Sequence, residues 1–468
     1  MTTALAKRPL LLPGLAALVA IAALVLWLAR GPDGRLTLRL PGTDQAPTGG
    51  GGAKSNPILA GKLIASSGKP ADLPGAWPRF RGPEGNAIST ESAPLLRTWD
   101  ASGPRQLWAI DVGEGFAGAV VLNGRVYLMD YDREHKQDAL RCLSLADGRE
   151  IWRYSYPVSV KRNHGMSRTV PAVTDKVVIA IGPKCHVVCL NPATGELRWG
   201  LDLVQQYGTT VPQWYAGQCP LLDQTNLILA PGGKDALLAA LDSETGKELW
   251  RTPNPRGWKM THSSVVAGEF DGERMYVYCA NNGVVGVSAK TGALLWECPD
   301  WKISLATVPS PVMLSAGRIF LSGGYGAGSL MLQLKKENGA ITAQPVFRVG
   351  PEVFGATQHT PILYGEHLYG ARADGKFVCL SQDGKVVWTS GPGQQFGLGS
   401  FVLADGVFLA MNDSGLLRVI EATPEKYHLL AQAQVLTGHD SWGPLALAGG
   451  RLIARDMTRM VCVDVERH

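Results

Sequence analysis

The segment "NPATGELRW" (residues 191–199) contains a Thr-Gly pair, and Trp199 follows the glycine four residues later. The same spacing from glycine to tryptophan occurs in four further segments: "LADGREIW" (145–152), "SETGKELW" (243–250), "AKTGALLW" (289–296) and "SQDGKVVW" (381–388). Self-similarity at a regular period is the signature of a repeat architecture. The chain is therefore expected to be a repeat protein.

Each repeat predicts four short strands. In residues 166–199, an apolar run, a β-branched run, "HVVCL" (186–190) and the segment ending in tryptophan are separated by turn residues, which is the layout of one propeller blade. Glycine suits the last turn because that hairpin needs a positive φ. The tryptophan lies on the outermost strand, where it can fill the space between blades. The repeated positions are Gly148, Gly195, Gly246, Gly292 and Gly384, with Trp108, Trp152, Trp199, Trp250, Trp296 and Trp388.

The number of blades follows from the closing aromatic residues. Six blades end at Trp152, Trp199, Trp250, Trp296, Phe347 and Trp388, and a degenerate seventh ends near Leu430. Residues 443–465 supply three more strands, and "RQLWAIDV" (105–112) supplies the missing fourth, so the first strand closes the ring and leaves no open sheet edge. We predict an all-β, eight-bladed β-propeller. Seven blades, with the degenerate unit fused to a neighbour, is the alternative.

The amino-terminal part differs from the repeats. "LLLPGLAALVAIAALVLWLA" (10–29) is long and apolar enough to cross a bilayer as a helix. Lys7 and Arg8 before it favour a cytoplasmic amino terminus. This pattern predicts a signal-anchor and a single-pass location in the cell inner membrane, with the propeller on the periplasmic (extracytoplasmic) side; a cleaved signal peptide is the alternative.

These features divide the chain into five parts. "PTGGGGAKSNP" (47–57) has no periodicity and little to bury, as in a flexible linker. The predicted parts are a cytoplasmic tail (1–9), a transmembrane signal-anchor (10–29), a flexible linker (30–75), a leader segment (76–104) and the propeller (105–468).

Composition limits the partners. The chain of 468 residues is 45% hydrophobic and 18% charged, with a net charge of +5 that forms no cationic stripe. A phosphate-tracking surface is therefore unsupported, and we expect no nucleic-acid partner. Four of the eight cysteines recur at one place in the repeats and are expected to be small buried residues: Cys142, Cys189, Cys379 and Cys462. Cys185 with Cys189, and Cys279 with Cys298, are open as disulfide pairs.

The turn motif resembles the tryptophan-docking motif of the pyrroloquinoline-quinone (PQQ) repeat family. "WPRFRGPEGNAIS" (77–89) resembles the leader found ahead of exported PQQ-like propellers, and "PGGKDALLAALD" (231–242) is similar to phrases of that subgroup. The resemblance covers about residues 77–468. The family includes quinoprotein dehydrogenases, scaffold proteins and, similar in fold, the propeller lipoprotein of outer-membrane barrel assembly.

The resemblance implies a choice between enzyme and scaffold. The family's larger dehydrogenases stack PQQ on two adjacent cysteines and hold Ca²⁺ through carboxylate and amide oxygens, whereas this chain has no Cys-Cys pair and carries its acidic residues mostly in hairpin turns. Motifs of serine hydrolases, P-loop enzymes and zinc proteases are also absent from the sequence. We assign no catalytic residue, metal site or cofactor, and a site for PQQ with Ca²⁺ is the open alternative.

Polar residues gather just before the innermost strands of several blades. Histidines recur there in blades 2, 4, 6 and 8, and these positions should converge on one mouth of the central channel. The candidate ligand site consists of His164, Arg168, Trp214, His262, Gln358, His359, His439, Asp440 and Trp442. The alternative is that these side chains only bind water in a polar channel wall.

The sequence thus favours a membrane-anchored propeller that binds a protein partner or a small ligand without turning it over. A PQQ-dependent oxidoreductase acting on alcohols or sugars is the second hypothesis.

Overall fold

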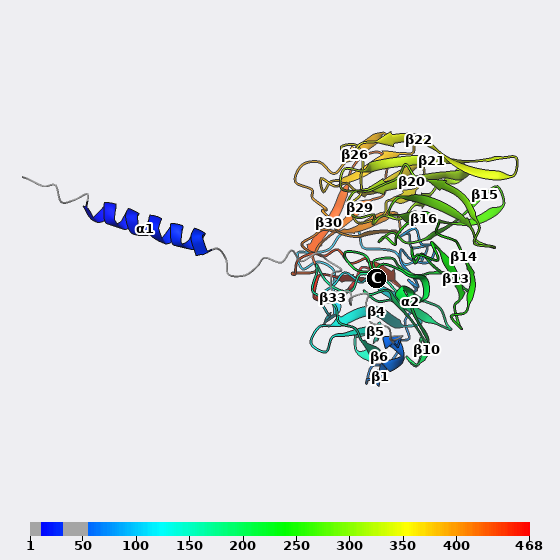
Figure 1. The fold of residues 1–468 in the computed structure, drawn as a ribbon, viewed down its shortest axis with the longest axis horizontal. Coiled ribbons are helices and arrows are strands. Elements are labelled where there is room, and N and C mark those ends of the chain that lie inside the picture. Colours follow the sequence, from blue (N-terminus) through cyan, green and yellow to red (C-terminus); the bar gives the residue numbers. More distant parts are fainter. Residues whose placement is uncertain (1–10, 31–54) are drawn as a thin grey trace, which may run out of the picture.

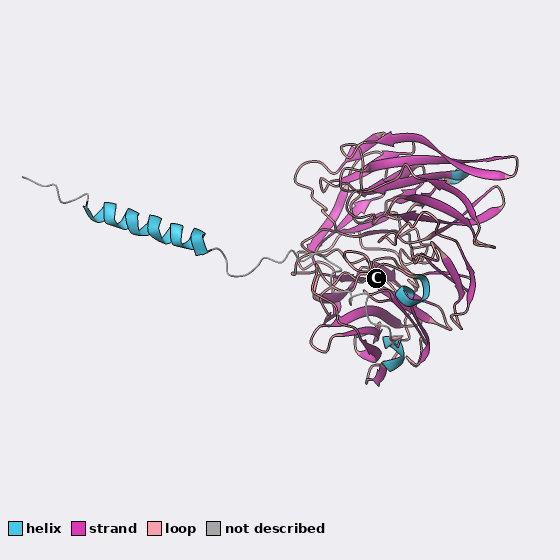
Figure 2. Ribbon diagram, in the orientation of Figure 1, coloured by secondary structure: helices cyan, strands magenta, loops and turns pink. Residues whose placement is uncertain are grey.

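The computed structural model describes residues 11–30 and 55–468. The predicted cytoplasmic tail (1–9) and residues 31–54 of the predicted linker lie outside these residues. The chain from residue 106 onward folds into eight small antiparallel sheets arranged as a ring (Figures 1 and 2). The alternation of short apolar runs with turn residues in the sequence of this region matches this series of short strands.

The sheets are the eight blades of a β-propeller. From the innermost strand outward, the first four are: blade 1, β3 (Ala119–Leu122), β4 (Arg125–Asp132), β5 (Gln137–Ser144), β6 (Glu150–Pro157) and β1 (Lys62–Ala65); blade 2, β7 (Ala172–Val173), β8 (Val178–Ile181), β9 (His186–Leu190) and β10 (Leu197–Asp202); blade 3, β11 (Leu221–Asp223), β12 (Asn226–Leu229), β13 (Ala239–Asp242) and β14 (Glu248–Arg251); blade 4, β15 (Val266–Phe270), β16 (Glu273–Ala280), β17 (Gly283–Ser288) and β18 (Leu294–Cys298).

The remaining blades follow the same plan. They are: blade 5, β19 (Val312–Met313), β20 (Arg318–Gly323), β21 (Gly328–Glu337) and β22 (Ala340–Val349); blade 6, β23 (Ile362–Tyr364), β24 (His367–Ala371), β25 (Phe377–Ser381) and β26 (Val386–Thr389); blade 7, β27 (Phe401–Ala404), β28 (Val407–Met411), β29 (Leu416–Glu421) and β30 (Leu429–Gln434); blade 8, β31 (Ala446–Ala448), β32 (Arg451–Arg455), β33 (Arg459–Asp464) and β2 (Gln106–Asp111).

The ring closes through its first and last strands. β2 pairs antiparallel with β33, with Trp108 opposite Cys462, so a strand from the start of the propeller completes the last blade. The prediction of an eight-bladed all-β propeller is confirmed, and the seven-bladed alternative is excluded because the degenerate unit forms blade 7 on its own.

The repeated glycine and tryptophan meet across the seam between neighbouring blades. The five glycines have φ between +71° and +78°. A Cβ atom at Gly195 would lie 2.6 Å from the ring of Trp152, and one at Gly246 would lie 2.7 Å from the ring of Trp199. The tryptophan of one blade therefore lies directly on the glycine turn of the next. Several indoles also donate a hydrogen bond to that turn, as Trp108 does to the carbonyl of Leu145 at 2.9 Å.

Part of the predicted linker is folded onto blade 1. The 3-10 helix η1 (Pro57–Ala60) buries Ile58 against Gly200, and β1 pairs antiparallel with β6 as a fifth strand. The prediction of a flexible linker over 30–75 is therefore wrong for this stretch, because Ile58 gains an apolar site and β6 offers an open edge to the β1 backbone. Two further short elements, α2 (Leu203–Tyr207) and η2 (Ser315–Gly317), lie between strands.

The apolar segment near the amino terminus forms the helix α1 (Leu11–Arg30). Within the described residues, however, no helix meets the length and apolarity needed to cross a membrane. The predicted transmembrane segment, and the single-pass inner-membrane location that depended on it, are therefore wrong.

All eight cysteines are buried and free. The two open disulfide pairings, Cys185–Cys189 and Cys279–Cys298, are not formed. The four repeated cysteines lie opposite the closing tryptophans across the outer strand pair, as Cys189 does opposite Trp199. Burial raises the pKa of the Cys189 thiol to about 12, so it remains a protonated packing group at neutral pH.

The seam between blades 1 and 2 contains a buried carboxyl group. Asp138, on β5, is fully buried, and its carboxyl group faces the equally buried hydroxyl of Tyr156. Burial raises the pKa of Asp138 well above its usual range. The folded protein therefore keeps the Asp138 carboxyl group protonated to a higher pH than the unfolded chain does. As the pH rises above the ordinary carboxyl pKa of about 4, the contribution of this group lowers the free energy of unfolding.

Replacing Asp138 by asparagine should remove this penalty. We expect the Asp138→Asn variant to gain stability relative to the wild type as the pH rises from 4 to 8, by up to about 1.4 kcal/mol per pH unit. Urea unfolding at several pH values measures the difference, and Glu134→Gln, at an exposed site in the neighbouring turn, is the control. A difference between Asp138→Asn and the wild type that stays constant with pH would contradict the expectation.

Candidate functional site

The leader segment enters the central channel and pairs with two blades. Trp77 exchanges backbone hydrogen bonds of 2.8 and 2.9 Å with Val121 on β3. On blade 7, the amide of Ser89 donates to the carbonyl of Leu403 at 2.8 Å, and Leu403 donates to Ala87 at 2.9 Å. Innermost strands have one free edge, and the leader covers that edge in these two blades.

Two leader arginines bind the segment to two further blades. Arg79 donates to the carbonyl of Leu222 on blade 3 at 3.0 Å. Arg81 donates to the carbonyls of Thr360 at 2.6 Å and Pro361 at 3.0 Å, at the start of blade 6. Burial lowers the pKa of Arg81 to about 9, so its guanidinium stays charged at neutral pH. The leader is thus held by backbone carbonyls on both sides of the channel.

The leader divides the channel into two cavities. Phe80 and Cys219 line both of them, so these side chains form the partition. We call the larger cavity, beside Arg79 and Glu84, the leader cleft, and the smaller cavity, beside Arg168, the Arg168 chamber.

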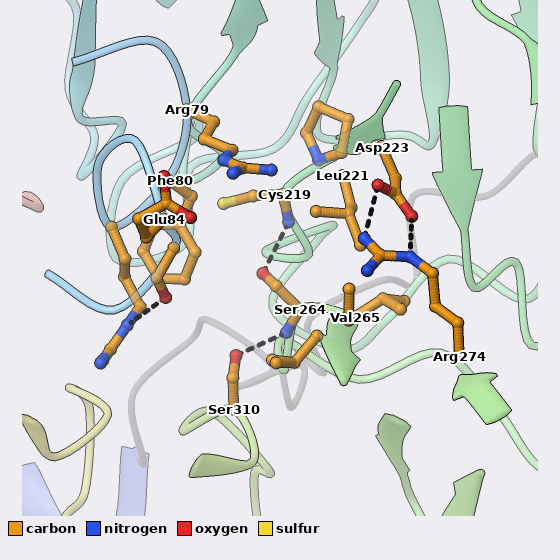
Figure 3. A pocket seen from close by; sticks show the side chains of 15 residues that line it. Arg79, Phe80, Glu84, Cys219, Leu221, Asp223, Ser264, Val265, Arg274 and Ser310 are labelled. Atoms are coloured by element: carbon orange, nitrogen blue, oxygen red, sulfur yellow. Dashed lines mark hydrogen bonds and ion pairs between the residues drawn. The ribbon is translucent and has the colours of Figure 1, made fainter. Parts of the chain in front are cut away.

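The leader cleft has a volume of about 260 Å³ and lies between the leader and blades 3 to 5 (Figure 3). Figure 3 shows Arg79 and Glu84 on one side and Asp223 and Arg274 on the other. Arg274 donates two hydrogen bonds to Asp223, at 2.7 and 3.1 Å, and the Tyr276 hydroxyl donates a third at 2.7 Å. The Asp223 carboxylate is therefore already satisfied within blades 3 and 4.

A chain of hydrogen bonds joins the blades around the channel. The amide of Cys219 donates to Ser264 Oγ at 3.0 Å, the amide of Ser264 to Ser310 Oγ at 3.0 Å, and the amide of Ser310 to Thr360 Oγ1 at 2.8 Å. The first two links are visible in Figure 3. Each blade from 3 to 5 is tied to the next, which fixes the side chains that line both cavities.

Five of the nine candidate residues from the sequence line the Arg168 chamber, which has a volume of about 70 Å³. They are Arg168, His262, Gln358, His359 and Trp442. The segments just before the innermost strands of blades 2, 4, 6 and 8 bring them together, because those segments face the channel axis. Phe80, Phe116, Gly217, Cys219, Val308 and Pro444 complete the wall.

Aromatic rings hold Arg168 at the chamber. Phe116 and Trp442 stack with ring centroids 5.0 Å apart, and the Arg168 guanidinium carbon lies 5.2 Å from the Phe116 centroid. This is cation–π distance. Arg168 Nη2 donates to the carbonyls of residues 163, 164 and 165 at 2.9 to 3.2 Å. The guanidinium is therefore fixed in place by carbonyls and an aromatic face.

The chamber contains one positive charge and neutral imidazoles. Burial and the nearby Arg168 charge lower the pKa of His262 to about 3, and burial lowers the pKa of His359 to about 4. Burial lowers the pKa of Arg168 to about 10. At neutral pH Arg168 is therefore protonated and both histidines are neutral.

The other four candidate residues lie outside the chamber. His164 and His439 are exposed, Trp214 is half-buried, and His439 Nδ1 lies 3.0 Å from Asp440. The four histidines therefore do not meet at one point. The sequence analysis did not select the other six wall residues. Phe116 precedes the innermost strand of blade 1 but is apolar, and Phe80 belongs to the leader.

The Arg168 chamber does not suit a PQQ–calcium centre. Calcium requires several converging carboxylate or carbonyl oxygens. The Arg168 chamber has no carboxylate in its wall and carries a positive charge. Among residues 11–30 and 55–468, no three or more His, Cys, Asp or Glu side chains are grouped as metal ligands would be.

Comparison with known proteins identifies the family of this chain. The family model described as outer membrane protein assembly factor BamB matches residues 60–210 and 136–390, more than half of the chain. This chain belongs to that BamB family. The match confirms a PQQ-like repeat propeller and covers the leader and the first six blades.

Two curated BamB proteins are similar in sequence. That of Shewanella oneidensis is 24% identical over 232 residues, which cover 48% of this chain and 56% of that protein. That of Burkholderia pseudomallei is 25% identical over 259 residues, 52% of this chain and 61% of that protein. The chain thus spans less than two thirds of the length of these relatives. Their names refer to the outer membrane, not to the inner membrane that the sequence predicted.

Two solved structures share the fold. BamB from Moraxella catarrhalis aligns with a TM-score of 0.53 at 12% identity, over 77% of this chain and 99% of its own. The computationally designed Ika8 protein aligns with a TM-score of 0.50 at 12% identity, over 77% of this chain and 99% of its own. At these identities the likeness concerns the fold alone.

Proposed function

We propose that this chain is a protein-binding scaffold in the assembly of outer-membrane proteins. The observation that carries the proposal is its membership of the BamB family, whose description names that process, over residues 60–390. A closed ring of eight blades offers loops on two faces and little internal freedom, which suits a binding platform.

The test is deletion of the coding sequence in the source cells. Loss of the protein should lower the amounts of folded outer-membrane β-barrel proteins, measured by quantitative mass spectrometry of purified outer membranes. Expression of the wild-type chain should restore them. Unchanged amounts of these barrels after deletion, in cells grown under the same conditions, would contradict the proposal.

We place the partner contact on the rim around the Arg168 chamber. His164, Trp214 and His439 lie there without contributing to the chamber wall, and two of them are exposed. Expression of a Trp214→Ala, His439→Ala double variant should restore the barrels less well than the wild type. A Glu425→Ala, Lys426→Ala double variant, in an exposed turn of blade 7, is the control. Full restoration of the barrel proteins by the rim variant would show that the partner contact does not lie on this rim.

A further inference from the structure

The Arg168 side chain carries a charge that no acidic group neutralises. Its hydrogen bonds go to the backbone carbonyls of residues 163, 164 and 165, and its Nε atom is enclosed without a hydrogen-bond partner. The only charge interaction that raises its pKa comes from the Tyr215 hydroxyl. A half-buried cation without a counter-ion is costly, because water no longer stabilises it fully. The site would therefore gain from an anion.

Acidic side chains near the rim are engaged with other partners. Glu114 pairs with Arg133 at 3.3 Å and with Arg162 at 2.6 Å. Asp413 accepts hydrogen bonds from Trp442 Nε1 at 2.8 Å and from the amide of Leu398 at 2.7 Å. These contacts hold the carboxylates at the outside of the mouth, so they leave the interior of the chamber positive.

Neutral donors stand beside the cation. His262, Gln358 and His359 share the chamber wall with Arg168. A neutral imidazole can donate one N–H, and an amide can donate two. The His262 ring bonds to the backbone of Tyr215, and the His359 ring bonds to the backbone of Leu398 and Trp442. Arg168 and the Gln358 amide are therefore the donors that remain for an anion in this small space.

The size and the walls of the chamber select the kind of anion. Its volume of about 70 Å³ exceeds the share of one liquid water, about 30 Å³. Phe80, Phe116 and Trp442 make much of the wall apolar. A phosphate or sulfate has no apolar part to place there, whereas a short carboxylate has a charged end for the guanidinium and a methyl or ethyl end for the rings.

We propose that the Arg168 chamber binds a small carboxylate, with one or two carbons beyond the carboxyl group. The carboxylate accepts hydrogen bonds from Arg168 and Gln358, and its alkyl end contacts Phe116 and Trp442. This activity is separate from the assembly role, because the chamber lies inside the channel and the proposed partner surface lies on the rim.

The test is ligand-observed NMR on the full chain with acetate, propionate and acetamide, at constant ionic strength. Acetate and propionate should bind saturably with one site per chain. Acetamide, which has the shape of acetate but no charge, should not bind. Equal binding of acetamide and acetate, or no saturable binding of either acid, would overturn the proposal.

Variants locate the site. Arg168→Gln should weaken acetate binding at least tenfold, while Arg133→Gln, at the exposed rim, should not change it. Because Arg168→Gln also loses contacts to carbonyls, a second variant, Val308→Phe, fills the chamber from another wall and leaves Arg168 in place. It should abolish acetate binding with little change in the unfolding midpoint. Acetate binding retained by both variants would overturn the proposal.

The same chemistry could reach the chamber as a free acid or as a glutamate side chain of a partner. The blocked peptide acetyl-Gly-Glu-Gly-amide separates these sources. Displacement of acetate by the peptide, dependent on Arg168, assigns the site to a protein carboxylate. Binding of free acids alone assigns it to a small molecule, and both results support a carboxylate site.

Discussion

Replacing Gly292 by alanine should destabilise the propeller by about 2–5 kcal/mol. Gly292 has a φ of +72°, and a Cβ atom there would lie 2.4 Å from the Trp250 ring. The positive φ costs a residue with a side chain about 1–2 kcal/mol. The contact adds an overpacking cost of about 1–3 kcal/mol, because Trp250 lies in the seam between blades 3 and 4 and Tyr276 packs against its ring.

A matched glycine separates these two costs. Gly272 lies in the turn between β15 and β16 of the same blade, has a φ of +77°, and would have no atom within 4 Å of an added Cβ. Gly272→Ala should therefore lower the free energy of unfolding only by the part that comes from the positive φ. Urea unfolding of both variants gives the comparison. Equal losses in the two variants would show that the tryptophan contact adds nothing to the free energy of unfolding.

Replacing Arg455 by methionine should cost about 3–5 kcal/mol at the seam that closes the ring. Arg455, on β32, is almost fully buried, and it donates hydrogen bonds to the carbonyls of Gly113 at 2.8 Å and Ala117 at 3.3 Å. It also donates to the backbone carbonyls of Asp456 and Met457, each at 3.0 Å. Methionine fills a similar length but leaves enclosed carbonyls without their donor, and hydrogen bonds to charged groups contribute about 1.5–3 kcal/mol each.

Arg451 on the same strand is the control for Arg455. It is half-buried and donates to the carbonyl of Gly449, two residues away, at 2.8 Å. Arg451→Met should lower the free energy of unfolding by less than about 1 kcal/mol, as is usual for substitutions away from buried networks. If the two variants unfold at the same urea concentration, the hydrogen bonds of Arg455 do not hold the closure.

The repeat pattern was enough to predict the propeller, since local signals mark every blade. A glycine that needs positive φ, a tryptophan four residues later and β-branched runs between turns are all short-range features. The first strand could also be assigned to the last blade, because Trp108 has the closing phase of the repeat. β1 could not be predicted in this way, because its residues are exposed and its place depends on the free edge of β6.

The channel was harder to predict than the blades. Arg168, His262 and His359 were found because polar residues at that phase interrupt an apolar pattern. Phe116 has the same phase in blade 1, but an aromatic residue there does not stand out from the core. Phe80 could not be placed at all, because its position follows from the hydrogen bonds of Arg79 and Arg81 to blades far along the chain. Such contacts leave no periodic signal in the sequence.

The leader also imposes an order of events on folding. Arg81 bonds to Thr360, which lies 279 residues later, and the amide of Gly449, 358 residues after Glu91, donates to the Glu91 carboxylate. At a synthesis rate of about 5–20 residues per second, Glu91 leaves the ribosome on the order of tens of seconds before Gly449 is made. During that interval the leader has no complete binding site. The leader's contacts with blades 6 and 8 can therefore form only after those blades have been made, so the last contacts of the fold depend on a segment that was synthesised early.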